Sequence, residues 1–258
     1  MPEIHPSAVV ESGAKLADGV RVGAQAYVGP EVELAAGVEI RAHGHVTGRT
    51  TIGEGSRIFP FAVVGEEPQD QSFASESSEL VLGRENQIRE HAVLHVGTRK
   101  GGGCTRLGDQ NLVMNGVHIG HDSQVGSDVI IASLCAVAGH VQIEDHARIG
   151  GLSGVHQFAR IGESAMVAAM SAVSQDVPPF ALVSGNRAAL SGLNVIGMRR
   201  RGFEPEARRA IKHAYHLVFN SKLRLEDALE RARAECGGSP EVTRLLAFLE
   251  SSERGFVR

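Results

Sequence analysis

Polar residues in three short segments of the chain have the types and spacing needed for acid–base chemistry. These segments are about eighteen residues apart and contain His121, Asp122, Gly139, His140 and Gln157. A histidine titrates near neutral pH and can take a proton from an alcohol or an amine if a neighbour holds its tautomer, a role open to Asp122 or His140. A glycine lets a substrate oxygen approach a backbone N–H, which would stabilise an oxyanion. Brought together, these groups suit acyl transfer by a general base.

Three other interpretations compete with a general base. Histidines can simply face solvent on a regular wall, which is the more common situation for a histidine taken singly. A zinc site is the second, but no two of the twelve histidines are five residues apart, and the spacing of His118 and His121 suits ligands on a helix. Covalent catalysis is the third, but Ser153 lacks a nucleophile-elbow setting and the three cysteines lack a clear base partner. We therefore expect general-base catalysis with no metal and no other cofactor.

A six-residue repeat of aliphatic residues indicates which elements would position these groups. Val, Leu or Ile recurs at every sixth position from Val10 to Val64, from Leu82 to Leu94 and from Leu107 to Val173, giving 25 such positions. Neither the spacing of a helix face nor the alternation of an ordinary strand fits this period. Three short strands per coil do fit, and stacked coils would pair in parallel about 4.8 Å apart. The sequence therefore predicts a mainly β protein, a parallel β-helix in which residues eighteen apart are neighbours.

Two interruptions of the repeat predict loops that leave the wall. Residues 66–79 are expected to form the first loop, because the repeat there would turn Asp70 and Glu76 inward. Residues 95–106 are expected to contain the second, because this gap is one residue longer than two repeats. Loops that interrupt a regular solenoid often carry binding groups, and a harmless insertion is an equal alternative.

The chain after the repeat has a different character. The segment from Gln175 to Pro179 contains paired prolines, which cannot donate ladder hydrogen bonds. Helix-start signals follow at Pro205 and Pro240, and a further amphipathic stretch covers residues 225–236. We expect a β-helix domain over residues 1–179, then a linker and a C-terminal helical cap over residues 180–258. Thirteen basic and nine acidic residues from Met198 onward give this cap a positive balance that could face an acidic carrier protein or a phosphate.

The composition excludes several classes of protein. A formal net charge of −4 over 258 residues does not suit a general polycation for nucleic acid. No stretch approaches eighteen uninterrupted apolar residues, and the N-terminus lacks a basic start followed by an apolar run, so no membrane span or export signal is expected. The cysteines are odd in number and far apart, which argues against a disulfide framework and favours a reducing cytoplasm.

Five segments of the chain together resemble one enzyme family. They are His118-Ile119-Gly120-His121-Asp122, Ala138-Gly139-His140-Val141, the run from Gly150 to Phe158, Gln175-Asp176-Val177-Pro178-Pro179, and Arg199-Arg200-Arg201-Gly202-Phe203. In this order, and with a helical cap, they are similar to the acyl-[acyl-carrier-protein]–UDP-N-acetylglucosamine O-acyltransferases that open lipid A synthesis. The repeat alone would be less specific, because acetyltransferases, nucleotidyltransferases and anhydrases share it.

The resemblance covers essentially the whole chain and implies a left-handed β-helix, a homotrimer with sites at subunit boundaries, and acyl transfer from a carrier-protein thioester to the 3-hydroxyl of UDP-N-acetylglucosamine. It implies that His121 is the general base, oriented by Asp122, and that the Gly139 amide supports the oxyanion. The substrate-binding residues that it implies are His118, His140, His156 and Gln157, with Gln69 and Asp70 from a neighbouring subunit, and Asn194, Arg200 and Arg201 near nucleotide or carrier phosphates. Ala169, with Met170 beside it, would set the length of the acyl chain.

Two departures from the family pattern leave alternatives open. The family commonly has a lysine three residues after the loop glutamine, where this chain has Ser72, and an arginine after the second-loop histidine, where it has Val96. The loss of two cations weakens the expected phosphate or carrier contacts, and Arg99 and Lys100 are the nearby candidates to compensate. An N-acyltransferase acting on a 3-amino UDP-sugar and a catalytically impaired trimeric paralogue are therefore the alternatives.

Overall fold

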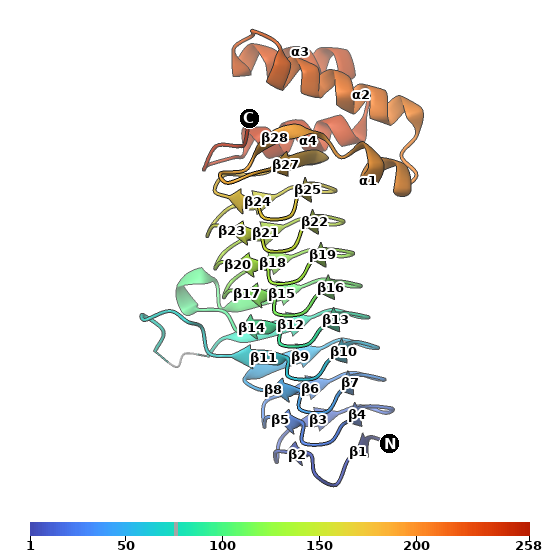
Figure 1. Cartoon of the computed structure of the whole chain (residues 1–258), viewed down its shortest axis with the longest axis vertical. Coiled ribbons are helices and arrows are strands. Elements are labelled where there is room, and N and C mark those ends of the chain that lie inside the picture. Colours follow the sequence, from blue (N-terminus) through green and yellow to red (C-terminus); the bar gives the residue numbers. More distant parts are fainter. Residues whose placement is uncertain (75–76) are drawn as a thin grey trace.

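The chain winds into a three-sided column of short strands that ends in a helical cap (Figure 1). In this computed structural model, which describes residues 1–74 and 77–258, each full coil gives one strand to each of three sheets. Strands pair in parallel with the coils above and below, and His118 aligns with Ala136 and then Ala136 with Gly154. The column is a left-handed parallel β-helix, which confirms the predicted fold class.

Most strands are two residues long, and each sheet runs along the length of the column. The first sheet contains β1 (Glu3–Ile4), β4 (Arg21–Val22), β7 (Glu39–Ile40), β10 (Arg57–Ile58), β13 (Gln87–Ile88), β16 (Leu112–Val113), β19 (Ile130–Ile131), β22 (Arg148–Ile149), β25 (Met166–Val167), β27 (Ala181–Ser184) and β28 (Ala189–Leu193). The second contains β2 (Val9–Val10), β5 (Tyr27–Val28), β8 (His45–Val46), β11 (Val63–Glu66), β14 (Val93–His95), β17 (His118–Ile119), β20 (Ala136–Val137), β23 (Gly154–Val155) and β26 (Ala172–Val173). The third contains β3 (Lys15–Leu16), β6 (Glu33–Leu34), β9 (Arg49–Ile52), β12 (Glu79–Leu82), β15 (Cys104–Leu107), β18 (Gln124–Val125), β21 (Gln142–Ile143) and β24 (Arg160–Ile161).

The interior of the column is filled by the residues of the six-residue repeat. From Val22 to Val173 every predicted inward aliphatic residue is buried, and Val10 and Leu16 in the first coil are partly buried. Side chains alternate between the two faces of a strand, so the neighbouring strand residue points outward and is free to vary. Full burial of an aliphatic side chain of this size contributes about 1.5–3 kcal/mol, which explains why the repeat is kept through so many coils.

Two loops leave the column on the same side (Figure 1). The first loop, residues 67–78, joins β11 to β12, and the position predicted for Glu76 lies outside the described residues. The second loop, residues 96–103, joins β14 to β15 and contains the short 3-10 helix η1 (Arg99–Gly101). Both loops are shorter than the predicted excursions, because Glu66 and Glu79 belong to strands and residues 104–107 pair with β12.

The first sheet continues beyond the paired prolines. Strand β27 pairs in parallel with β25, and β28 then turns back and pairs antiparallel with β27. The cap consists of α1 (Val195–Arg200), α2 (Pro205–Tyr215), the π-helical turn η2 (His216–Asn220), α3 (Leu225–Cys236) and α4 (Pro240–Glu250). The helix starts predicted at Pro205 and Pro240 are confirmed, whereas the division into domains at 179 and 180 stays a prediction. None of the helices in the described part of the chain has the length and apolar character required to span a bilayer.

Candidate active site

The predicted catalytic residues lie at one corner of the column, between the second and third sheets, which we call the His121 corner (residues 121–122, 139–140 and 157–158). Asp122, His140 and Phe158 occupy the same place in three successive coils, with left-handed φ angles of 60°, 60° and 65°. Because each coil repeats this conformation, the side chains stack: the His140 and Phe158 rings are parallel, with centroids 4.5 Å apart. The N–H of His140 donates to the carbonyl of His121 at 2.9 Å. The predicted eighteen-residue register is therefore confirmed at this corner.

His121 and Asp122 form a closely packed pair at this corner. Nδ1 of His121 lies 2.8 Å from Oδ2 of Asp122, whose side chain is 0% exposed, while the His121 side chain keeps 19% exposure. A carboxylate can only accept hydrogen bonds, so the neutral ring carries its proton on Nδ1 and its lone pair on Nε2. His140 Nδ1 is 3.8 Å from the same oxygen, too far for a hydrogen bond. Of the two orienting partners considered from the sequence, the geometry selects Asp122.

Gly139 packs against the outer edge of the His121 ring. A Cβ atom at position 139 would lie 2.7 Å from Nε2 and 2.7 Å from Cε1 of that ring, so a side chain here would displace the imidazole. Among the described residues, none accepts a hydrogen bond from the Gly139 N–H. The glycine therefore leaves Nε2 accessible and keeps a backbone donor available beside it.

Two further imidazoles surround His121. Burial lowers the pKa of His118, and the neighbouring charge of His95 acts in the same direction. Burial also lowers the pKa of His95, whose Nδ1 donates to the Glu67 carbonyl at 2.7 Å. The two rings lie 5.0 Å apart, and His95 Nε2 has no hydrogen-bond partner among the described residues. The lowered pKa values keep both rings neutral near pH 7; His95 is buried, whereas His118 is partly exposed and is the more accessible of the two to a polar ligand. His95 was not predicted as a binding residue. Its position at the second interruption of the repeat was the sequence feature that pointed to it.

The first loop brings a carboxylate toward this corner in the same chain. The N–H of Ser72 donates to Oδ1 of Asp70 at 2.8 Å, and this hydrogen bond is the main cause that lowers the pKa of Asp70. The charges of His121 and Lys100 act in the same direction. Lys100 Nζ also lies 3.3 Å from the Ser72 hydroxyl, so the second loop places a cation beside the residue that replaces the expected lysine. Gln69 is exposed, and the predicted reach of this loop into a neighbouring subunit stays a prediction.

The other predicted contacts on the column lie on its surface. His156 and Gln157 are both exposed, and His156 Nδ1 is 3.3 Å from Nη2 of Arg254 near the C-terminus. Ala169 and Met170 are exposed at a different corner, between the first and second sheets, where Met170 as a residue is 71% exposed. The structure therefore groups Gln157 with the His121 corner and places the two chain-length candidates apart from it.

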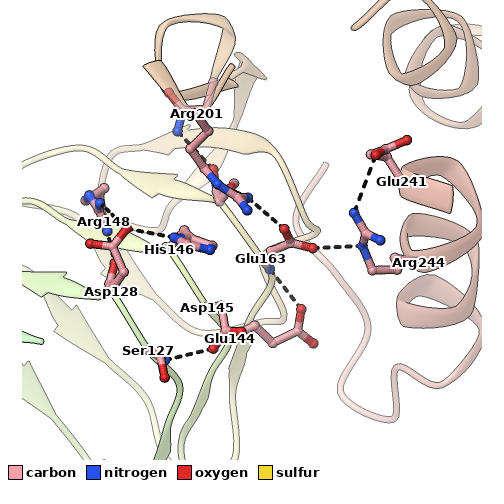
Figure 2. Close-up of polar contacts among 12 residues, drawn as sticks. Ser127, Asp128, Glu144, Asp145, His146, Arg148, Glu163, Arg201, Glu241 and Arg244 are labelled. Atoms are coloured by element: carbon pink, nitrogen blue, oxygen red, sulfur yellow. Dashed lines mark hydrogen bonds and ion pairs between the residues drawn. The ribbon is translucent and has the colours of Figure 1, made fainter. Parts of the chain in front are cut away.

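Arg201 points back onto the column in this chain, as Figure 2 shows. Its Nη1 lies 2.6 Å from Oε1 of Glu163 and 2.5 Å from Oγ of Ser164. Glu163 also pairs with Arg244 of α4 at 2.8 Å, and Arg244 lies 3.8 Å from Glu241 in the same helix. Arg201 thus helps to hold the cap on the column, and its predicted phosphate contact stays a prediction.

Asn194 has a structural role at the start of the cap. Its Oδ1 accepts a hydrogen bond from the N–H of Gly197 at 3.0 Å, which caps α1, and its Nδ2 donates to the Ser164 carbonyl at 2.9 Å. Arg200 lies at the end of α1 and is exposed. Arg200 is therefore the more accessible candidate of the two for an anionic ligand.

A metal ion is the alternative occupant of the His121 corner. His121, Asp122 and His140 each offer one ligand atom, and these atoms lie within 4.8 Å of one another. Asp122 Oδ2, however, already accepts hydrogen bonds from His121 and from the hydroxyl of Thr98 at 2.7 Å. Those contacts describe a hydrogen-bonded pair, so metal-free general-base chemistry remains our prediction.

Two cavities are relevant to substrates. One of about 560 Å³ adjoins the His121 corner and is lined by Asp122, His140, Phe158, Lys100, Arg106 and neighbouring residues. A larger one, about 930 Å³, lies in the cap between β28, α1 and α2, and its basic lining includes Arg199, Arg208, Arg209 and Lys212. The smaller cavity lies on the Asp122 and His140 side of the corner, and neither His121 nor Gly139 is among the residues that line it.

The fold and the histidine–carboxylate corner define an acyltransferase of the left-handed β-helix class. The chain belongs to the acyl-[acyl-carrier-protein]–UDP-N-acetylglucosamine O-acyltransferase family, as the resemblance predicted. The enzyme of that name from Myxococcus xanthus is 46% identical over 258 residues, and the one from Paraburkholderia phytofirmans is 47% identical over 262, each match covering all of both chains. A family model described as Udp N-acetylglucosamine O-acyltransferase, Domain 2, matches residues 176–257.

Solved structures agree with this assignment. The structure of LpxA from Acinetobacter baumannii superimposes with a TM-score of 0.96 at 41% identity, covering 99% of each chain. The UDP-N-acetylglucosamine acyltransferase of Arabidopsis gives a TM-score of 0.88 at 34% identity over 99% of this chain and all of the other. The column and its cap are therefore both shared with proteins of known structure.

Proposed function

We propose that the protein transfers an acyl chain from the thioester of acyl carrier protein to the 3-hydroxyl of UDP-N-acetylglucosamine, the first step of lipid A biosynthesis. The names of its relatives state this donor and acceptor. The observation that carries the proposal is the His121–Asp122 pair, in which a fully buried carboxylate fixes the ring and leaves Nε2 open beside Gly139.

The reaction begins with proton removal from the sugar. Nε2 of His121 accepts the proton of the 3-hydroxyl while the oxygen attacks the thioester carbonyl, and Asp122 stabilises the imidazolium that forms. The carbonyl oxygen becomes an oxyanion, for which the Gly139 N–H is the available donor. Collapse of this intermediate breaks the carbon–sulfur bond, and the imidazolium returns its proton to the thiolate of the carrier. The products are the O-acyl sugar nucleotide and the free carrier thiol.

Other features of the chain support the proposed partners and location. The basic lining of the cap cavity is suited to an acidic carrier protein. The His121 side chain keeps 19% exposure in the single chain, which fits a homotrimer in which a second subunit completes the site. Cys104, Cys135 and Cys236 are all free thiols, which fits the proposed cytoplasmic location.

The second candidate is N-acylation of a 3-amino UDP-sugar. His121 would serve equally well for an amine, and Ser72 in place of the expected lysine is the feature that favours a changed acceptor. We favour O-acylation because Lys100 Nζ, 3.3 Å from the Ser72 hydroxyl, keeps a cation beside Asp70.

A mass spectrum of the products tests both candidates together. Purified protein is incubated with a mixture of acyl and 3-hydroxyacyl carrier-protein thioesters and with either UDP-N-acetylglucosamine or its 3-amino analogue. We expect an O-acylated product, and its mass gives the chain length and hydroxylation. Product from the amine alone would establish the second candidate. No product with either acceptor would refute both and favour an impaired paralogue.

A further inference from the structure

The second loop contacts the carboxylate that orients His121. The backbone N–H of Thr98 donates to Oδ1 of Asp122 at 2.8 Å, and the Thr98 hydroxyl donates to Oδ2 at 2.7 Å. Thr98 is 3% exposed and Asp122 is 4% exposed, so water does not compete for either hydrogen bond. One residue therefore holds both oxygens of the carboxylate, and the same Oδ2 receives Nδ1 of His121.

The loop is built to hold Thr98 at this place. The N–H of Gly97 donates to the carbonyl of Glu79 at 3.1 Å, and the N–H of Glu79 donates to the carbonyl of Gly103 at 2.8 Å, which fixes both ends of the loop to β12. Within the loop, the Thr98 hydroxyl accepts a hydrogen bond from the Gly101 N–H at 3.2 Å. The Thr98 hydroxyl thus accepts a hydrogen bond from the Gly101 N–H and donates one to Asp122, and these two contacts fix its orientation.

The packing of Gly101 is an independent sign of this close approach. A Cβ atom at position 101 would overlap the Asp122 carboxylate. The backbone of Asp122 is also fixed from the opposite side, because its N–H donates to Oγ1 of the fully buried Thr105 at 2.8 Å. The carboxylate has no room to rotate while the second loop is in place.

We infer that Thr98 is a positioning residue for catalysis: it fixes the plane of the Asp122 carboxylate, which in turn fixes the tautomer and direction of His121. This inference rests on the proposed function, because it matters only if His121 is the general base. It also assigns a purpose to the second loop, which the sequence left open between a binding element and a harmless insertion. Without the hydroxyl, one carboxylate oxygen would lose a buried donor and the His121 ring would gain freedom of orientation.

The test compares Thr98→Val, which keeps the shape and removes the hydroxyl, with Thr98→Ser, which keeps the hydroxyl. Acyl transfer from 3-hydroxyacyl carrier protein to UDP-N-acetylglucosamine is measured at saturating and limiting substrate. We expect kcat to fall about tenfold in Thr98→Val, with both KM values within about twofold of the original, because an imprecisely held base weakens the reaction more than binding. We expect Thr98→Ser to keep kcat within about twofold to threefold.

Two further variants make the result decisive. Thr50→Val is the matched control, since it removes another fully buried threonine hydroxyl, one that donates to the Thr47 carbonyl in a different coil, and should leave kcat unchanged. Gly101→Ala should reproduce the loss in kcat by displacing the carboxylate, even if Thr98→Val folds poorly. Loss of activity in His121→Ala together with unchanged kcat in Thr98→Val and Gly101→Ala would overturn the inference and leave the proposed function intact. Full activity in His121→Ala would instead refute the proposed mechanism.

Discussion

Among the described residues, two close histidine–aspartate pairs lie at different corners of the same column, and their surroundings differ. In the His121 corner, Nδ1 of His121 is 2.8 Å from Asp122. At the corner between the third and first sheets, Nδ1 of His146 is 2.7 Å from Oδ2 of Asp128, as Figure 2 shows. Asp128 and His146 also have left-handed φ angles, of 50° and 61°. Both pairs thus share a short contact from Nδ1 to a carboxylate, although His121 and Asp122 are adjacent in sequence whereas Asp128 and His146 are eighteen residues apart.

The surroundings of the second pair give it a different character. The Asp128 side chain is 44% exposed and also pairs with Nη2 of Arg148 at 3.0 Å, whereas Asp122 is enclosed and held by Thr98. Burial acts to raise the pKa of Asp128, but the hydrogen bonds from His146 and Arg148 outweigh it, and the net effect is a lowered pKa. The Asp128 carboxylate thus binds the Arg148 guanidinium as well as the His146 imidazole. The burial and the other hydrogen-bond partners of the carboxylate therefore decide which histidine–aspartate pair is a catalytic candidate.

The largest expected contrast is between the two histidines. Replacing His121 with Ala should lower kcat by about 100-fold to 10,000-fold, the range for loss of a general base. Replacing His146 with Ala should leave kcat within about twofold, because the His146–Asp128 pair lies at a different corner of the column from His121. Steady-state kinetics of both variants measure the difference. Equal losses would show that the imidazoles act through the stability of the column.

A smaller loss is expected from filling the space in front of the His121 ring. Gly139→Ala places a methyl group where a Cβ atom would be 2.7 Å from Nε2, so the ring must move and kcat should fall about tenfold or more. Gly238→Ala is the matched control, because a Cβ atom there meets nothing within 4 Å. Kinetics of the two variants, with unfolding midpoints measured alongside, distinguish displacement of the base from general damage. Equal activity of the two alanine variants would contradict the proposed place of Gly139.

The second pair should affect stability as a function of pH. Because the pKa of Asp128 is lowered in the folded chain, its contribution is present above the unfolded value of about 3.9 and is lost as pH falls through the folded value. Asp128→Asn should therefore lower the urea midpoint at pH 7, and its difference from the original chain should shrink below about pH 4. Urea titrations at a fixed protein concentration check this. A constant difference down to pH 3 would mean that ionisation of Asp128 is not responsible.

The smallest effect is expected from removing divalent metals. If the His121 corner works by hydrogen bonding alone, dialysis against EDTA should leave kcat unchanged within error, and added Zn²⁺ should not increase it. Metal analysis of the purified protein accompanies the assay. Loss of activity on chelation with recovery on adding Zn²⁺ would identify His121, Asp122 and His140 as ligands instead.

The sequence was sufficient for much of this architecture because the repeat is local and regular. The inward positions from Val22 to Val173 follow from one period, and the same period brings His121, His140 and Phe158 into adjacent coils. The interruptions of the repeat predicted that two loops exist, but not where they lie, because loops that leave the repeat take their position from tertiary contacts. The contact of Thr98 with Asp122 spans 24 residues and has no periodic signal. The two loops meet where Lys100 reaches Ser72, 28 residues away, and that contact is equally invisible.

The cap could be predicted as helices but not as a set of contacts. Proline and acid at the helix starts predicted α2 and α4 correctly. The pairing of Arg201 with Glu163 depends on how the cap is seated on the last coils, which no local pattern encodes. The resemblance implied a phosphate near Arg201, which stays a prediction, and it gave no sign of the ion pair with Glu163.

The reversal of β28 against β27 has a consequence for assembly. A stack of parallel coils ends in a row of unsatisfied N–H and C=O groups, onto which the first coil of another molecule could add and so form a filament. The antiparallel turn changes the hydrogen-bonding pattern at this end of the first sheet, and Figure 1 shows the helices lying over it. This end of the column is therefore blocked against head-to-tail growth, and the molecule has a defined length.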